Sequence, residues 1–252
     1  MMQSLEDHMP SKPSVFVGMP CYDSVKRETV MALLKLFDKF RSSAIKAQFR
    51  TINSSLVTHG RNMVTCGFLH SGYDYLLFID ADVSFEPEAI LRMLVAKRDV
   101  ICTPYRLKLA DMTVKYPVNF KDAKKIDIEE LDVVDIVEIE SGPAGMMLIH
   151  RKVFETLMKK NSNYKINIPN NKLKEMNDEV MGVPTSEDPI TQYLYNFWDT
   201  SFYLSSGAWK GEDLAFCDLV RGAGFKIHAN IDSETTHHGA YSWKGRFKEV
   251  LR

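Results

Sequence analysis

The sequence offers little to attract nucleic acid or a membrane. Its 252 residues carry a formal net charge of -1 and give a pI of about 6.7, whereas neutralising the phosphates of nucleic acid normally needs a basic excess. No apolar run approaches the roughly 18 residues that a membrane-spanning helix requires. Residues 1–13 are polar and lack the apolar segment of a signal peptide. The sequence therefore predicts a cytoplasmic protein with no nucleic-acid partner and no membrane span.

Cysteine is also scarce, and the four cysteines form no C-x-x-C pair. Their spacing does not match that of a zinc finger. Cys66, Cys102 and Cys217 lie inside apolar runs, where a small buried hydrophobe is the expected role. A chain of this length can bury a full core, so folding needs neither disulfides nor a structural metal.

Short apolar runs alternate with segments of helical periodicity along the first half of the chain. This alternation predicts a mainly parallel sheet flanked by helices, because parallel strands need crossover connections. Gly72 is placed to end the second helix. The expected strands are residues 14–19, 47–52, 75–79 and 100–102, and the expected helices are residues 27–46, 61–70 and a segment that starts at Pro87.

After about residue 110 the pattern becomes mixed. Residues 161–188 are rich in Asn, Lys and Pro, and we expect a long surface loop there. No linker divides the chain, so the predicted fold class is α/β: a mixed, mostly parallel central sheet in one domain at 14–252, preceded by a flexible arm at 1–13. Strands are expected near 114–120, 133–139, 146–149 and 225–229, and helices near 152–158 and 212–221.

An acidic turn, Asp80-Ala81-Asp82, directly follows the apolar run at 75–79. In open α/β sheets the carboxyl ends of the strands form the ligand crevice. Two carboxylates at such an end suit a hard cation such as Mg²⁺ or Mn²⁺, which prefers oxygen ligands and shares them with substrate phosphates. The same pair is also compatible with an ordinary Asp-rich turn.

The context of this turn makes the metal interpretation more specific. Leu76 to Val83 resembles the D-x-D element of GT-A glycosyltransferases, especially the group similar to family 2. The resemblance implies a Rossmann-like GT-A fold, with a nucleotide-binding half at 14–110 and an acceptor-binding half at 111–252. It also implies a nucleotide-sugar donor and a carbohydrate acceptor.

The resemblance further assigns roles to the two carboxylates. A divalent ion, Mn²⁺ or Mg²⁺, would bridge the two phosphates of the nucleotide-sugar, with UDP as the favoured nucleotide. Asp82 would be the direct metal ligand. Asp80 would contact the ribose or a metal-bound water, and Ala81 between them would lie against the donor.

Three segments are similar to elements that bind the donor in this family. Pro20, Cys21 and Tyr22 end the first strand in the manner of a nucleotide-base pocket, with Tyr22 placed to stack on the base. Arg61 stands at the head of a helix, where its charge and the helix dipole both suit a diphosphate. Gly145 closes a loop of small residues that lets the donor sugar approach the backbone.

Other motifs point to the acceptor and to the metal. Glu212 and Asp213 resemble the family's E-D element, which supplies the base that takes the acceptor's proton in inverting transfer. Asp213 is the predicted base, with Glu212 as the second choice. Trp209 is a candidate platform for the acceptor sugar. His237 and His238 resemble the H-x-G element that completes the metal shell; adjacent strand residues face opposite sides, and the motif favours His237.

Two departures limit the resemblance. No Q-x-x-R-W element is present, which argues against processive polysaccharide synthesis. Pro104-Tyr105 with Lys108 is similar to a further family element but differs in spacing, so no role is assigned to it. Two alternatives remain open: a haloacid-dehalogenase-type phosphatase with Asp80 as nucleophile, and a non-catalytic carbohydrate-binding protein.

Overall fold

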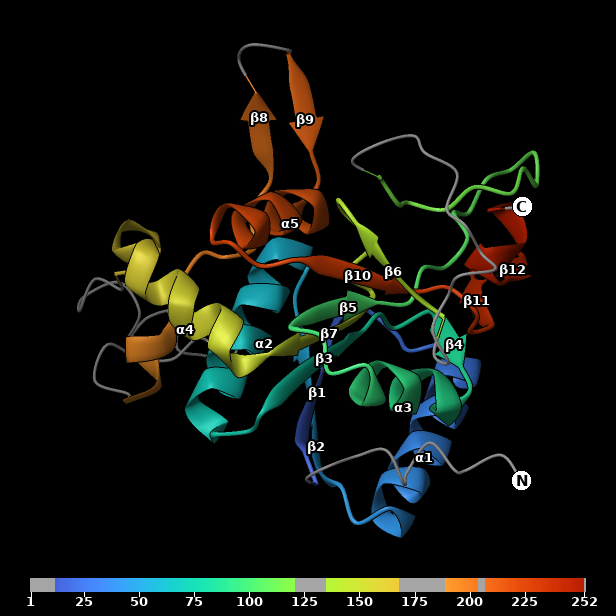
Figure 1. Cartoon of the computed structure of the whole chain (residues 1–252), viewed down its shortest axis with the longest axis horizontal. Helices are drawn as coiled ribbons and strands as arrows, with labels where there is room; N and C mark the ends of the chain where they lie inside the picture. Colours follow the sequence, from blue (N-terminus) through green and yellow to red (C-terminus); the bar gives the residue numbers. More distant parts are fainter. Residues whose placement is uncertain (1–11, 121–134, 168–188, 204–206, 252) are drawn as a thin grey trace.

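A seven-stranded mixed sheet lies at the centre of the protein, with helices on both faces (Figure 1). The computed structural model describes residues 12–120, 135–167, 189–203 and 207–251. The first half of the chain contains β1 (Ser14–Cys21), α1 (Arg27–Ser42), β2 (Lys46–Asn53), α2 (Val57–Ser71), β3 (Tyr75–Ile79), β4 (Val83–Phe85), α3 (Pro87–Val95) and β5 (Val100–Cys102).

The second half adds the remaining strands and two helices. They are β6 (Ile136–Ile139), β7 (Met146–His150), α4 (Arg151–Lys160), β8 (Ser201–Tyr203), β9 (Ala208–Lys210), α5 (Glu212–Gly222), β10 (Ile227–Asn230), β11 (Thr235–His238) and β12 (Ser242–Gly245). Within the described residues, short 3-10 helices lie at Ser162–Tyr164, Pro189–Tyr193 and Phe247–Val250. No helix in the described ranges is long and apolar enough to cross a membrane.

The strand order is β2-β1-β3-β7-β5-β10-β6. Strands β2, β1, β3, β5 and β10 run in one direction, and β7 and β6 run against their neighbours. This confirms the predicted α/β class with a mixed, mostly parallel, Rossmann-like sheet. Because β7 is antiparallel to β3, the start of β7 meets the end of β3, which carries the acidic turn.

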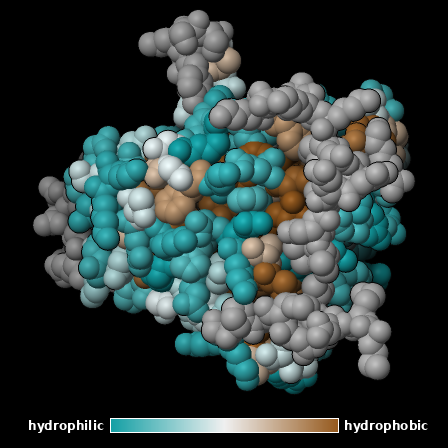
Figure 2. Space-filling model, viewed as in Figure 1, coloured by the Kyte–Doolittle hydropathy of each residue, from teal (hydrophilic) through white to brown (hydrophobic). Residues whose placement is uncertain are grey.

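Apolar side chains on alternating positions fill a core on each face of the sheet. On β3, Leu76 and Phe78 join the core under α2, α4 and α5, whereas Leu77 and Ile79 join the core under α1 and α3. All four are fully buried, as expected for a strand covered on both faces. A space-filling view shows hydrophobic residues gathered towards the centre of one face, among hydrophilic ones (Figure 2).

A three-stranded sheet, β12-β11-β4, stands beside the central one. Strand β4 begins directly after the acidic turn, and β11 pairs with it antiparallel, with His237 opposite Val83. The backbone N–H of His238 donates to the carbonyl of Asp82 at 2.7 Å. This small sheet therefore brings a C-terminal strand next to the acidic turn.

Several boundaries differ from the expected ones. Strand β1 continues through Pro20 to Cys21; it has lost its β3 neighbour after Gly18, and a proline is tolerated where a strand has a free edge. Helix α1 ends at Ser42, because the chain turns through Ala44, with φ of 53°, into the pairing of β2.

The structure also tests the predicted helix end at Gly72, the strand at 114–120 and the burial of the cysteines. Gly72 ends α2 in the left-handed conformation, with φ of 75°, as predicted. Residues 114–120 form only an isolated bridge to Ser141 instead of a strand. Cys66, Cys102 and Cys217 are buried, as expected. Most of the expected arm at 1–13 and of the loop at 161–188 falls outside the described residues.

Candidate active site

The acidic turn is fixed to three separate parts of the chain. The N–H of Asp80 donates to the carbonyl of Gly145 at 2.8 Å, and the N–H of Lys26 donates to the carbonyl of Ala81 at 2.9 Å. The carbonyl of Asp82 is held by β11. Strand β3 therefore ends in a turn whose two carboxylates are held at the carboxyl edge of the sheet, as predicted for a ligand crevice.

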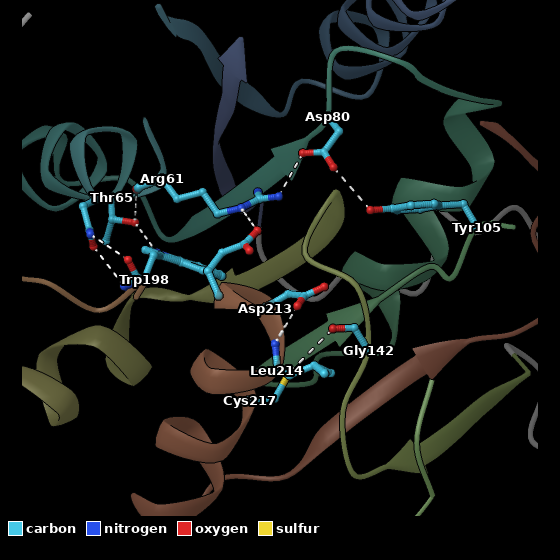
Figure 3. A network of polar contacts seen from close by, with 11 residues as sticks. Arg61, Thr65, Asp80, Tyr105, Gly142, Trp198, Asp213, Leu214 and Cys217 are labelled. Atoms are coloured by element: carbon cyan, nitrogen blue, oxygen red, sulfur yellow. Dashed lines mark hydrogen bonds and ion pairs between the residues drawn. The ribbon is translucent and has the colours of Figure 1, made fainter. Parts of the chain in front are cut away.

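Asp80 lies between two side chains that use both of its oxygens. Arg61 Nη2 donates to Oδ1 at 3.0 Å, and Tyr105 Oη donates to Oδ2 at 3.3 Å (Figure 3). A Cβ at Gly145 would overlap the Asp80 carboxylate and the Tyr105 hydroxyl. Glycine at 145 therefore makes room for this contact. Its predicted contact with the donor sugar stays a prediction.

The sequence predicted Arg61 at the head of a helix, and this position is wrong. Arg61 is buried in the second turn of α2. The helix starts four residues earlier, at Val57, so Arg61 points into the core. Its guanidinium is 3% exposed and lies over the rings of Phe78 and Trp198, at 5.2 and 5.5 Å from their centroids.

Two carboxylates compensate this buried charge. Besides Asp80, Glu212 accepts from Arg61 Nε at 3.2 Å, while Nη1 is buried with no partner among the described residues. Burial by itself would lower the pKa of Arg61, but Asp80 and Glu212 outweigh it and raise the pKa. Arg61 therefore joins the acidic turn to the start of α5.

Glu212 and Asp213 form the first turn of α5, and the structure gives them different surroundings. Glu212 is held by Arg61. Asp213 Oδ1 accepts the N–H of Leu214 at 2.8 Å, which leaves its carboxylate apart from that ion pair (Figure 3). Burial, followed by the charge of Glu212, raises the pKa of Asp213 above its usual range. A carboxylate with a raised pKa is better matched to accepting a proton near neutral pH.

Asp82 contacts two basic side chains from distant segments. Lys108 Nζ forms an ion pair with Oδ2, and His237 Nε2 lies 3.5 Å from Oδ1. Burial by itself would raise the pKa of Asp82, but the hydrogen bonds from His237 and Lys108 outweigh it and lower the pKa to about 2. Asp82 is therefore an anion over the whole physiological pH range.

The orientation of His237 fits a cation between it and Asp82. Nδ1 lies 2.9 Å from the carbonyl of Arg106, to which it must donate a proton, since a carbonyl only accepts. Nε2 faces the carboxylate of Asp82: the protonated ring forms an ion pair with it, and the neutral ring directs a lone pair at it, beside which a cation would fit. A second hydrogen-bond partner that fixes the tautomer in this way is typical of a metal-ligating histidine.

His238 faces the other way. Its Nε2 lies 2.7 Å from the hydroxyl of Ser84 and its Nδ1 3.4 Å from that of Ser242, and the residue is buried. Burial lowers the pKa of His238. Of the two adjacent histidines, His237 is the one directed at Asp82.

These residues can provide only part of a metal shell. Across the described ranges, no three His, Cys, Asp or Glu side chains converge as a metal site. The two oxygens of Asp80 are taken by Arg61 and Tyr105. Asp82 and His237 are therefore the pair suited to Mn²⁺ or Mg²⁺, and the other coordination positions would come from substrate oxygens or water.

The remaining predicted residues lie at the end of β1 and on β9. The carbonyl of Cys21 accepts the N–H of Ser54 at 3.0 Å, and the side chain of Tyr22 is 71% exposed at the end of β1. Pro20 packs close to Gly60 at the start of α2. Trp209, on the hairpin of β8 and β9 that leads into α5, is 74% exposed.

Sequence reasoning assigned no role to three residues that the structure places at this site. Tyr105 and Lys108 contact Asp80 and Asp82, and the Trp198 ring packs on Arg61. The similarity of Pro104-Tyr105 with Lys108 to a family element was the available signal for two of them. No sequence signal was found for Trp198, which lies between two segments outside the described residues.

Known proteins resemble this chain in structure but not in sequence family. No protein-family model matches the sequence, and no curated protein does. Among solved structures, A197 from STIV is 19% identical over 90% of this chain and 86% of that one, with a TM-score of 0.47. The chain is also similar to 4-diphosphocytidyl-2C-methyl-D-erythritol synthase from Anaerococcus prevotii (9% identity, 73% and 97% coverage, TM-score 0.32). It is similar to HddC from Yersinia pseudotuberculosis complexed with GMP-PN (10% identity, 56% and 78% coverage, TM-score 0.30). Likenesses this distant identify neither a family nor a reaction.

Proposed function

We propose that this protein is a metal-dependent, inverting glycosyltransferase that takes its sugar from a nucleotide-diphosphate sugar, with UDP favoured. The observation that carries the proposal is the pair formed by Asp82 and His237 at the end of β3. Nε2 of His237 faces the carboxylate at 3.5 Å, while its Nδ1 is held by a backbone carbonyl. The protonated ring pairs with Asp82 directly, whereas in the neutral ring Nε2 and the carboxylate form a pair of ligands for a shared cation.

Asp82 and His237 would hold Mn²⁺ or Mg²⁺. When bound, the ion neutralises the diphosphate that leaves with the nucleotide. The ion suits the chain's own chemistry, because Asp82 stays ionised down to a pH of about 2. Tyr22, which is exposed at the end of β1, would stack on the base of the donor.

Asp213 would be the catalytic base. It takes the proton of the acceptor hydroxyl while that oxygen forms a bond to the anomeric carbon, and the bond from that carbon to the diphosphate oxygen breaks. Arg61 supports this division of roles by holding Glu212, so that Asp213 is the carboxylate left for the acceptor. Trp209 precedes these acids by a few residues and would support the apolar face of the acceptor sugar.

Calorimetry with UDP, with Mn²⁺ and with EDTA, tests the metal pair directly. We expect wild-type protein to bind UDP tightly only with Mn²⁺, and Asp82→Asn and His237→Ala to lose that dependence. Asp38→Asn, which removes an exposed carboxylate on α1, is the matched control. UDP binding that is equally strong in EDTA would overturn the metal site, and no UDP binding would overturn the donor.

The product of the reaction tests the base and the competing functions. We expect the product to have the inverted configuration at the anomeric carbon, and we expect Asp213→Asn to lose the transfer activity. A product with retained configuration would refute the base assignment. The phosphatase alternative requires Asp80 as a free nucleophile, although both of its oxygens are engaged. Release of phosphate from simple esters would favour the phosphatase, and absence of donor hydrolysis would favour a carbohydrate-binding protein.

A further inference from the structure

Lys108 is held against the acidic turn by the packing of its own stem. Its Nζ pairs with Asp82 Oδ2, the oxygen not facing His237, and its side chain is 31% exposed. A Cβ at Gly239 would lie 3.2 Å from Lys108 Cδ and 2.9 Å from the ring of Trp243. The glycine of the H-x-G element therefore leaves the space through which Lys108 reaches Asp82.

The backbone around Lys108 is also fixed. The N–H of Leu107 donates to the carbonyl of Lys115 at 2.8 Å, and Trp243 Nε1 donates to the carbonyl of Leu109 at 3.1 Å. The carbonyl of Arg106 accepts from His237 at 2.9 Å. Lys108 is thus placed by strands β11 and β12, unlike a lysine free on the surface.

Of the two cations that contact the carboxylates of the turn, Arg61 and Lys108, Lys108 is the one that solvent reaches, with 31% of its side chain exposed. Arg61 is 3% exposed and shared by Asp80 and Glu212. Among the described residues, Asp82 is the carboxylate that pairs with Lys108. A divalent ion that binds Asp82 competes with this ammonium for the same carboxylate, and the displaced ammonium then needs another anion.

We propose that Lys108 is a diphosphate-binding residue that occupies Asp82 in the free protein and transfers to the donor's diphosphate when the metal ion binds. This inference rests on the proposed function. Lysine suits the role because its compact ammonium binds phosphate as a point charge on a flexible stem. Two effects of opposite sign follow: Lys108 weakens the binding of metal alone, and it strengthens the binding of nucleotide diphosphate.

The variant Lys108→Gln separates these effects. In titrations of Mn²⁺ alone, followed by the loss of the free-ion EPR signal, we expect the variant to bind Mn²⁺ severalfold more tightly than wild type. In calorimetry with UDP at saturating Mn²⁺, we expect its affinity to fall about tenfold or more, as for loss of a charged hydrogen bond. The affinity for UMP, which lacks the second phosphate, should fall less in this variant. Lys108→Arg should keep part of the affinity for UDP.

Lys115→Gln, an exposed lysine of the same segment, is the matched control and should behave as wild type. Circular dichroism establishes that each variant is folded. If Lys108→Gln binds Mn²⁺ more weakly, Lys108 only positions Asp82, and the inference is wrong. The inference is also wrong if Lys108→Gln binds UDP as tightly as wild type does. If UDP binding by wild type still depends on Mn²⁺ in that case, the proposed function stands.

Failure of the proposed function gives a different result. If wild type binds UDP equally well in EDTA and in Mn²⁺, the metal site is wrong. Lys108 is then still the residue that binds the diphosphate only if Lys108→Gln lowers the affinity for UDP in EDTA. If wild type binds no UDP under either condition, both proposals are overturned.

Discussion

Replacing Gly145 by alanine tests the geometry of the acidic turn with a single methyl group. The added Cβ would lie 2.6 Å from Asp80 Cγ, whereas ordinary contact at such a position begins at 3.4 Å. It would come closer still to Asp80 Oδ2 and to the hydroxyl of Tyr105. Gly145 does not have a positive φ, so the effect is one of space and involves no backbone strain.

The size of the effect follows from these distances. Asp80 has to move by about 0.8 Å or more, which disturbs the geometry of its 3.0 Å bond to Arg61. Overpacking of this kind costs about 1–3 kcal/mol. For a chain of this length, about 2 kcal/mol lowers the melting temperature by roughly 4–8 °C. A displacement near 1 Å in a reacting group can cost about 100-fold in rate.

Thermal unfolding and sugar transfer should be measured on the same samples. Gly222→Ala is the control, because no atom lies within 4 Å of a Cβ placed there. It should unfold at or slightly above the wild-type temperature, since alanine favours the end of α5. In an Asp80→Ala background, Gly145→Ala should cost less than in wild type, because one of the two side chains that clash with the new methyl group has been removed and only the Tyr105 hydroxyl remains.

Two results would refute this reasoning. A Gly145→Ala protein with wild-type stability would mean that the turn has room that the structure does not show. A cost that is the same with and without the Asp80 side chain would mean that the clash lies elsewhere.

Three further predictions concern the residues around the turn. Arg61→Met leaves Asp80 and Glu212 without their shared cation and should lower the free energy of unfolding in urea by about 3–5 kcal/mol; a loss below about 1 kcal/mol would show that the carboxylates do not depend on it. Asp213→Asn should raise the melting temperature at pH 7, because the raised pKa of Asp213 means that wild-type stability falls as pH rises above 3.8 through that pKa. The gain should vanish below pH 3.8, and a gain that persists there has another cause. Trp209→Ala should change the free energy of unfolding by less than about 0.5 kcal/mol, since the ring is largely exposed, and should raise the KM for acceptor; an unchanged KM would remove Trp209 from the acceptor site.

The sequence by itself determined the features that depend on local pattern. Alternating apolar runs and helical periodicities predicted the α/β class, and Gly72 predicted the end of α2, because both follow from short-range geometry. The run at 75–79 placed Asp80 and Asp82 at the carboxyl end of a buried strand. The two-residue period of a strand predicted that only one of His237 and His238 would face Asp82, and the resemblance to the H-x-G element favoured His237.

Only the tertiary structure decided which charges meet. Arg61 pairs with Glu212 across 151 positions of the chain, and Lys108 with Asp82 across 26. Such pairs depend on how α2, α5 and the segment after β5 pack around one sheet edge, which no local period encodes. The structure also decided that Gly145 accommodates the protein's own Asp80 and Tyr105, because a missing side chain is informative only once its neighbours in space are known.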